Sequence, residues 1–148
     1  MSDKNESSGR SAPQIPSDMK AFNQKLISEH RANHGQLTGD MAGRKVLLLT
    51  TIGARSGLPR TAVLGYGRSG ENLVIIASNN GAPRDPLWYR NLVAHPTATV
   101  ELGPDRFGVR ARTAGPEERK ELGAALPYLE QQQKLTEREL PLVVLKKL

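Results

Sequence analysis

Residues 47–60 read Leu-Leu-Leu-Thr-Thr-Ile-Gly-Ala-Arg-Ser-Gly-Leu-Pro-Arg. The apolar and β-branched first half, extended by Val46, predicts a strand over Val46–Ile52. Gly53–Gly57 then predicts a turn, and Thr61–Tyr66 predicts a returning strand. We therefore expect this stretch to form a β-hairpin, which points to a fold built on strands.

Strands outnumber helices along the rest of the sequence. Gly67–Asn72 predicts a second turn, and the short connections between the first three strands predict antiparallel pairing. Strand and helix do not alternate and no internal repeat is present, so we expect a mainly β (α+β) fold, a closed or split antiparallel β-barrel with flanking helices. The other expected elements are a helix from Ser17 or Asp18 to about Asn33–Gly35, a strand at Leu73–Ala77, a helix from Pro86 to about Ala94, strands at Thr97–Leu102 and Phe107–Thr113, a helix from about Pro116 to Gln133 that Pro127 kinks or divides, and a strand at Leu140–Leu145.

The turn at Gly53–Gly57 carries residue types that bind anions. Glycines let backbone N–H groups approach a ligand closely, and the guanidinium groups of Arg55 and Arg60 match phosphate or carboxylate oxygens. The segment is not a Walker loop, because the Gly-Lys-Ser/Thr ending and the following helix are missing. A hairpin tip with solvated arginines explains the same residues equally well, so the residues alone leave both interpretations open.

The length of 148 residues fits one domain. Met1–Ser17 is polar, with almost nothing to bury, so we expect a disordered tail and a single domain over residues 18–148. The absence of Cys excludes disulfides, thiolate ligands and Cys nucleophiles. His30 and His34 stand four residues apart on the first helix, but no third ligand is near. We therefore expect ordinary surface histidines and no metal site.

The net charge of +6 favours an anionic partner. Nucleic acid is the weaker interpretation, since only 4% of the residues are aromatic and no run of Lys and Arg is present. No uncharged stretch approaches the roughly 20 residues of a bilayer span, and Met1–Pro16 lacks the apolar core of a signal peptide. We therefore expect a soluble protein of the cytoplasm, and the oligomeric state stays open.

The first expected helix is amphipathic and basic. Met19, Phe22, Leu26 and Ile27 recur at helical spacing. The favoured interpretation is a helix that packs on the domain. The alternative is a helix that covers the site or rests on an anionic membrane, which would place the protein at the inner face of the plasma membrane.

Two later segments combine polar residues with the end of a strand or with a helix. Ser78–Pro83 follows a buried strand, so its backbone and its Ser hydroxyl would line a cleft or form a plain turn. Asp85–Leu92 holds the one Trp of the sequence. Trp88, Leu92 and Val93 are expected to share one face of the helix, and Trp88 alone is most simply a core anchor.

Taken together, these segments resemble the deazaflavin-dependent nitroreductase family, the F420H2-dependent reductases of actinobacteria. The resemblance rests on three ordered blocks, Thr50–Arg60, Ala77–Ala82 and Pro86–Leu92 with the following His95-Pro96, and spans nearly all of the chain after the tail. It implies a split β-barrel that binds coenzyme F420 in a groove, without flavin mononucleotide or metal. It also implies hydride transfer from the reduced cofactor to an electron-poor small molecule, such as a quinone, a nitroaromatic compound or an activated alkene.

The resemblance further implies which residues form the site. Arg55, Ser56 and Arg60, with Ala54 beside them, would bind the phosphate and the oligoglutamate tail of F420, whose negative charge suits a basic protein. Ser78 would be the catalytic hydrogen-bond donor to the acceptor oxygen that gains charge as hydride arrives. The deazaflavin and its ribityl chain would be lined by Thr61, Ala62, Val63, Leu64, Ile76, Ala77, Ser78, Asn79, Leu87, Trp88, Tyr89, Arg90 and Asn91.

The sequence departs from the family pattern at three places. Ala54 stands where a second basic residue is usual and Asn79 where a Lys is frequent, which predicts weaker binding of the tail. Tyr128 is the sole tyrosine of the last helix, so it is the candidate substrate contact, and the missing tyrosines argue against nitroimidazole reduction. Two rival interpretations remain: an FMN-dependent oxidoreductase on the same kind of barrel, and a non-catalytic binder of F420 or of nucleic acid.

Overall fold

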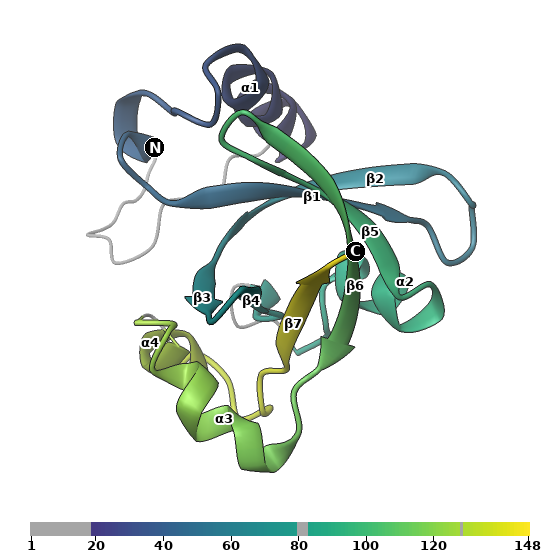
Figure 1. Cartoon of the computed structure of the whole chain (residues 1–148), viewed down its shortest axis with the longest axis vertical. Helices are drawn as coiled ribbons and strands as arrows, with labels where there is room; N and C mark the ends of the chain where they lie inside the picture. Colours follow the sequence, from purple (N-terminus) through teal and green to yellow (C-terminus); the bar gives the residue numbers. More distant parts are fainter. Residues whose placement is uncertain (1–18, 80–82, 128) are drawn as a thin grey trace.

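The computed structural model describes residues 19–79, 83–127 and 129–148. The predicted tail, Asn80–Ala82 and Tyr128 lie outside the described residues. One seven-stranded sheet forms the centre of the fold, with the strand order β2-β1-β5-β6-β7-β4-β3 (Figure 1). The strands are β1 (Val46–Ile52), β2 (Pro59–Gly65), β3 (Gly67–Ser69), β4 (Asn72–Ile76), β5 (Thr97–Leu102), β6 (Asp105–Thr113) and β7 (Leu142–Lys147). Every neighbouring pair is antiparallel, which confirms the predicted pairing.

The predicted hairpin is formed by β1 and β2. Leu48 lies opposite Val63, and Ile52 lies opposite Pro59. The returning strand therefore begins two residues before the predicted Thr61, because Pro59 and Arg60 still continue the ladder beside the end of β1. On its other side β1 pairs with β5, so the strand that carries the turn is held from both sides.

The sheet curls because its two outermost strands are consecutive in the chain. β2 ends at Gly65 and β3 begins at Gly67, so Tyr66 alone separates the two edges. The edges must therefore meet at this point, and the sheet takes the form of a split barrel, as Figure 1 shows. The prediction of a turn over Gly67–Asn72 is wrong for Gly67–Ser69, which pair with β4, and for Asn72, which begins β4. A side chain at position 67 would collide with the carbonyl of Ala125, so glycine permits this close packing.

Three strands are buried on both faces, which explains their nearly continuous apolar sequences. Within β1, Leu47 and Leu49 face the inner core, while Val46 faces α1 (Met19–Ala32). The inner core also takes Leu73 and Ile75 from β4, and Val143 and Leu145 from β7. On the outer side, Val74, Leu142 and Val144 pack with Leu122 and Leu126 from the region of α3 (Pro116–Gly123).

The first helix packs on the sheet, as favoured from the sequence. Leu26 and Phe22 of α1 contact a cluster that includes Val46. Arg31 and Glu101 of β5 form a two-pronged ion pair with N–O distances of 2.9 and 2.8 Å. No helix within the described ranges is long and apolar enough to cross a bilayer.

His30 corrects the prediction of two surface histidines. It lies on the buried face of α1 with 1% of its surface exposed, whereas His34 is exposed. The imidazole nitrogen Nε2 of His30 has no hydrogen-bond partner within the described residues. Burial lowers the pKa of His30 below its ordinary value of 6.5. The polar identity of a histidine gave no sign of this burial.

Two further helical predictions meet different outcomes. In α2 (Leu87–Ala94), Trp88 and Leu92 enter the inner core, but Val93 is 68% exposed, so the predicted shared face is wrong for Val93. The last predicted helix is divided, as the interruption at Pro127 suggested. Its two parts are α3 and α4 (Leu129–Gln133).

Candidate functional site

The turn between β1 and β2 is held in one shape by its own hydrogen bonds. The Gly53 N–H donates to the Leu58 carbonyl at 2.8 Å, and the Gly57 N–H donates to the Gly53 carbonyl at 2.9 Å. The Ser56 hydroxyl oxygen accepts from the Leu58 N–H at 3.1 Å, which leaves the hydroxyl hydrogen able to donate outward. Gly57 has φ +70°, a conformation that favours glycine.

Asn91 of α2 fixes this turn from below. Its side-chain nitrogen donates to the Thr51 hydroxyl at 3.1 Å, and its side-chain oxygen accepts from the Ala54 N–H at 3.0 Å. Asn91 is fully buried, so its bond to Thr51 is shielded from water and its bond to the exposed Ala54 is partly shielded. The first and third blocks of the sequence are therefore joined by one amide.

The upper surface of the turn presents unused donors. Arg55, Ser56 and Arg60 are exposed. In the part of the chain that the structure describes, neither Arg55 nor Arg60 has an ion-pair partner. The backbone N–H groups of Arg55 and Ser56 likewise have no hydrogen-bond partner there. Fixed backbone donors next to free guanidinium groups form an arrangement that binds phosphate or carboxylate.

The predicted lining residues of β2 are divided between the two faces of the sheet. Ala62 and Leu64 pack against the inner core, and Val63 packs beneath α1. Thr61 shares a hydroxyl–hydroxyl hydrogen bond of 2.7 Å with Thr50 of β1. A ligand on one face of β2 would therefore meet only alternate residues of Thr61–Leu64.

The second block follows the end of β4. Ile76 is half-buried, and Ala77 is fully buried with its N–H bonded to the Pro141 carbonyl at 2.9 Å. Ser78 is half-buried, and no described group bonds its hydroxyl. Asn79 has φ +50° and donates from its side chain to the Arg84 carbonyl at 3.0 Å.

Arg138 joins the second block to the start of α2. Its guanidinium group lies 2.6 Å from a carboxylate oxygen of Asp85 and donates to the Ser78 carbonyl at 3.0 Å and the Arg84 carbonyl at 3.4 Å. The chain after β4 is thereby tied to the residues that precede α2. The sequence gave no sign of this role, since Arg138 stands in a polar stretch without a motif.

The third block mixes buried and exposed residues along α2. Trp88 is 9% exposed and packs edge-to-face on Tyr89, with ring centres 6.2 Å apart. The Tyr89 hydroxyl bonds the Thr113 hydroxyl at 2.7 Å. Leu87 and Arg90 are exposed. The structure thus connects all three blocks around α2, with Trp88 and Asn91 beneath the surface.

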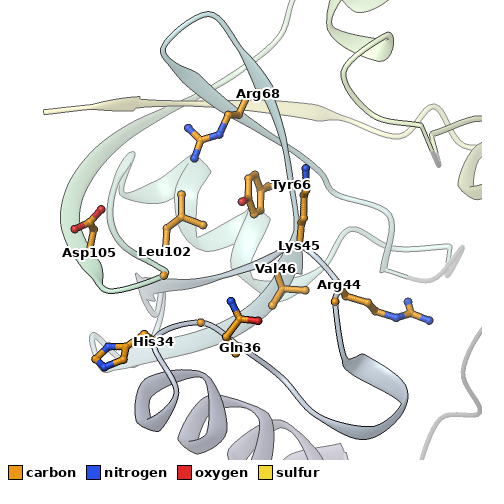
Figure 2. Close-up of a pocket in the computed structure, with 12 residues that line it drawn as sticks. His34, Gln36, Arg44, Lys45, Val46, Tyr66, Arg68, Leu102 and Asp105 are labelled. Atoms are coloured by element: carbon orange, nitrogen blue, oxygen red, sulfur yellow. The ribbon is translucent and has the colours of Figure 1, made fainter.

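Two cavities lie away from these blocks. One of about 330 Å³ is lined by residues of the α1–β1 loop, Tyr66 and the β5–β6 turn (Figure 2). Another of about 510 Å³ lies between α3 and α4. Neither is lined by the predicted cofactor residues, so the cofactor groove stays a prediction. The described residues hold no group of three or more potential metal ligands.

The curled antiparallel sheet, with a donor-rich turn anchored to a short helix, defines a split-barrel protein suited to an acidic ligand. A solved F420H2-dependent reductase, FDR-A, has this fold, with a TM-score of 0.62 and 31% identity over 70% of this chain and 95% of that chain. The chain belongs to the F420H(2)-dependent quinone reductase family, whose profile matches residues 24–147. The predicted family and the F420-dependence of its members are thereby confirmed.

Relatives in mycobacteria agree with this assignment. An F420H(2)-dependent quinone reductase of Mycobacterium tuberculosis strain H37Rv is 42% identical over 88 residues, which are 59% of this chain and 59% of that protein. A second protein of the same strain, also described as an F420H(2)-dependent quinone reductase, is 35% identical over 104 residues, 68% of this chain and 87% of that protein. The match therefore spans about 59% of the length of the first relative.

Proposed function

We propose that this protein is an F420H2-dependent reductase that delivers a hydride to a quinone-type acceptor. The observation that carries the proposal is the turn after β1, which carries free guanidinium groups and backbone donors and is anchored to α2 through Asn91. The chain belongs to the F420H(2)-dependent quinone reductase family. The family name gives F420 as the acidic ligand that suits this turn, and a quinone as the class of acceptor.

The residues of the turn would bind the anionic end of the cofactor. Arg55 and Arg60 pair with the phosphate and carboxylates, and Ser56 donates its hydroxyl hydrogen. When bound there, F420H2 would supply the hydride from its reduced ring. Ser78 donates a hydrogen bond to the acceptor oxygen that gains negative charge. The remaining predicted lining residues orient the ring, with Trp88 and Asn91 supporting the floor.

The acceptor is proposed to be a quinone in the first place, because the family and its mycobacterial members carry that name. Nitroaromatic compounds and activated alkenes are the further candidates, since they are electron-poor like quinones and can therefore accept a hydride. Tyr128 is the proposed substrate contact. A screen of F420H2 oxidation with one compound of each class ranks them.

A titration with F420, followed by deazaflavin fluorescence, tests the cofactor site. Arg60→Ala should weaken binding by about tenfold or more, because a hydrogen bond to a charged group is worth roughly 1.5–3 kcal/mol. The matched control is Arg44→Ala, which removes the same charge at the opposite end of β1 and should leave the affinity unchanged. Equal affinities of Arg60→Ala and wild type would contradict the placement of the tail.

The catalytic role of Ser78 has a separate readout. Ser78→Ala should lower the turnover of F420H2 with a quinone while the F420 affinity stays near that of the wild type. The absorption spectrum of the same purified protein tests the rival interpretation as an FMN-dependent enzyme. A yellow protein with a flavin spectrum would support it, and a colourless protein would exclude it. Binding of F420 without hydride transfer to any acceptor would favour a non-catalytic binder.

A further inference from the structure

A cavity of about 330 Å³ opens at the end of the barrel opposite the Gly53–Gly57 turn. Val46, the first residue of β1, lies in its wall, whereas the turn follows Ile52, the last residue of that strand. Seven strand residues at about 3.3 Å each separate the two places by roughly 20 Å. A single phosphate group cannot contact both.

Two backbone segments meet at the wall of this cavity. Gly35 in the α1–β1 loop has φ +92°, and a Cβ atom added to it would lie 2.7 Å from the Cα of Gly103 in the β5–β6 turn. The loop and the turn therefore pack backbone to backbone. Val46 and Leu102 provide apolar surface beside them.

The cavity has an excess of unpaired positive charge. Arg44, Lys45 and Arg68 line it, and none of them has an ion-pair partner among residues 19–79, 83–127 and 129–148. Asp105 is the one carboxylate among the lining residues. A bound anion would pair with these charges.

Three hydrogen-bond donors line the cavity. Figure 2 shows the side chains of Lys45 and Arg68 flanking the Tyr66 ring, while Arg44 points away from it. The Arg68 guanidinium carbon lies 5.7 Å from the centre of that ring. The Tyr66 hydroxyl has no hydrogen-bond partner in the described part of the chain. These donors come from three positions around the joint between β2 and β3.

We propose that this cavity is a second anion-binding site, which takes a small ligand with a phosphate group. Lys45 and Arg68 would bind the phosphate oxygens, the Tyr66 hydroxyl would donate a third hydrogen bond, and the carbon part would lie on Val46 and Leu102. Two sources offer this chemistry, a soluble phosphate ester and the headgroup of an anionic phospholipid. The proposal does not rest on the proposed function.

The test measures binding of two probes to the full chain. The soluble probe is glycerol 3-phosphate, followed by backbone amide shifts in NMR, and the lipid probe is a phosphatidylglycerol vesicle, followed by co-sedimentation with phosphatidylcholine vesicles as the blank. The variant Lys45→Ala/Arg68→Ala should lose about tenfold or more in affinity for the productive probe. Arg110→Ala, which removes an exposed charge on β6, is the matched control and should bind as the wild type does.

The results distinguish a soluble phosphate ester from a phospholipid headgroup, and this cavity from the Gly53–Gly57 turn. Saturation by glycerol 3-phosphate, with shifts at Gly35 and Gly103, supports a soluble ester, and binding to phosphatidylglycerol vesicles alone supports a headgroup. Restored binding in Lys45→Arg/Arg68→Lys shows that charge and not the fold was lost. Equal affinity of the double alanine variant and wild type, loss of binding in Arg60→Ala instead, or no binding of either probe would overturn the proposal. Unchanged F420 affinity in the double variant shows that the two sites are separate.

Discussion

Asn91 illustrates how one buried amide positions a surface turn. Both of its bonds run from α2 to the hairpin, one to the Thr51 side chain and one to the Ala54 backbone. An amide is suited to this place because it donates and accepts at once. The order of the turn therefore depends on a residue that contributes no charge to it.

Replacing Asn91 with Leu should destabilise the protein by about 1–3 kcal/mol, because the Ala54 N–H and the Thr51 hydroxyl lose their partners. Denaturant unfolding gives the free energy, and the F420 titration reports the accompanying loss of order in the turn. Val93→Ala, two residues further along α2 and exposed, should change stability by less than about 0.5 kcal/mol. Similar losses in the two variants would contradict the role of the amide.

His30 makes stability dependent on pH. Its pKa is lowered chiefly by burial, so the unfolded chain takes up a proton that the folded protein resists. As the pH falls below 6.5, the unfolding free energy should fall, by about 1.4 kcal/mol for each pH unit by which the pKa is lowered. Above that pH the full contribution is present.

Unfolding free energies measured between pH 5 and 8 test this expectation. His30→Met removes the titrating group, so its stability should show a weaker dependence on pH whatever its absolute value. His34→Gln changes an exposed histidine and should keep the dependence of the wild type. If His30→Met retains the full slope, another group is responsible.

At the scale of elements, the α1–β1 loop and the β5–β6 turn can pack against each other because Gly35 and Gly103 have no side chains. Gly35→Ala should cost about 2 kcal/mol or more, since it adds a collision with Gly103 to the strain of a positive φ. Gly43→Ala is the matched variant, with φ +78° and no atom within 4 Å of an added Cβ. It should lose only the strain, about 1 kcal/mol. Thermal or denaturant unfolding of both variants gives the difference, and equal losses would refute the collision.

The strands were predictable where local pattern and tertiary structure agree. β1 and β5 begin and end at the predicted residues, because each is an apolar and β-branched run that ends at a glycine, and the run of β5 also follows Pro96. β3 was not predictable, since Gly67–Ser69 is strand only through its pairing with β4. The last strand begins at Leu142 and not at Leu140, because Pro141 has no backbone N–H to donate to the ladder, and it runs past the predicted Leu145 to Lys147 beside β6.

The candidate site was predictable only where its residues form a local sequence pattern. The turn and α2 carry local signals, such as glycines, arginines and a proline at the start of a helix. The contacts that connect these segments carry no local signal. Asn91 and Arg138 form their hydrogen bonds with residues 37 and 60 positions away in the chain. Their roles depend on how the curled sheet brings distant segments together, which no local pattern contains.

At the scale of the whole molecule, the net charge of +6 should act on a ligand before contact. Association of F420 should slow several-fold between about 50 and 300 mM salt, because the Debye length shortens over this range. Stopped-flow fluorescence gives the rates. Arg55→Ala/Arg60→Ala should lower the rate at low salt and reduce the slope, while a rate that does not respond to salt would refute electrostatic steering.

The place of β7 within the sheet has a consequence for synthesis. β7 lies between β6 and β4, so it joins the part of the sheet containing β1 and β5 to the part formed by β4 and β3. On the ribosome these two parts have no hydrogen-bonded bridge until Leu142–Lys147 has emerged. Until then Leu47, Leu49 and Ile75 lack the layer that will cover them. The nascent chain is thus most exposed to aggregation and chaperone capture just before the last strand arrives.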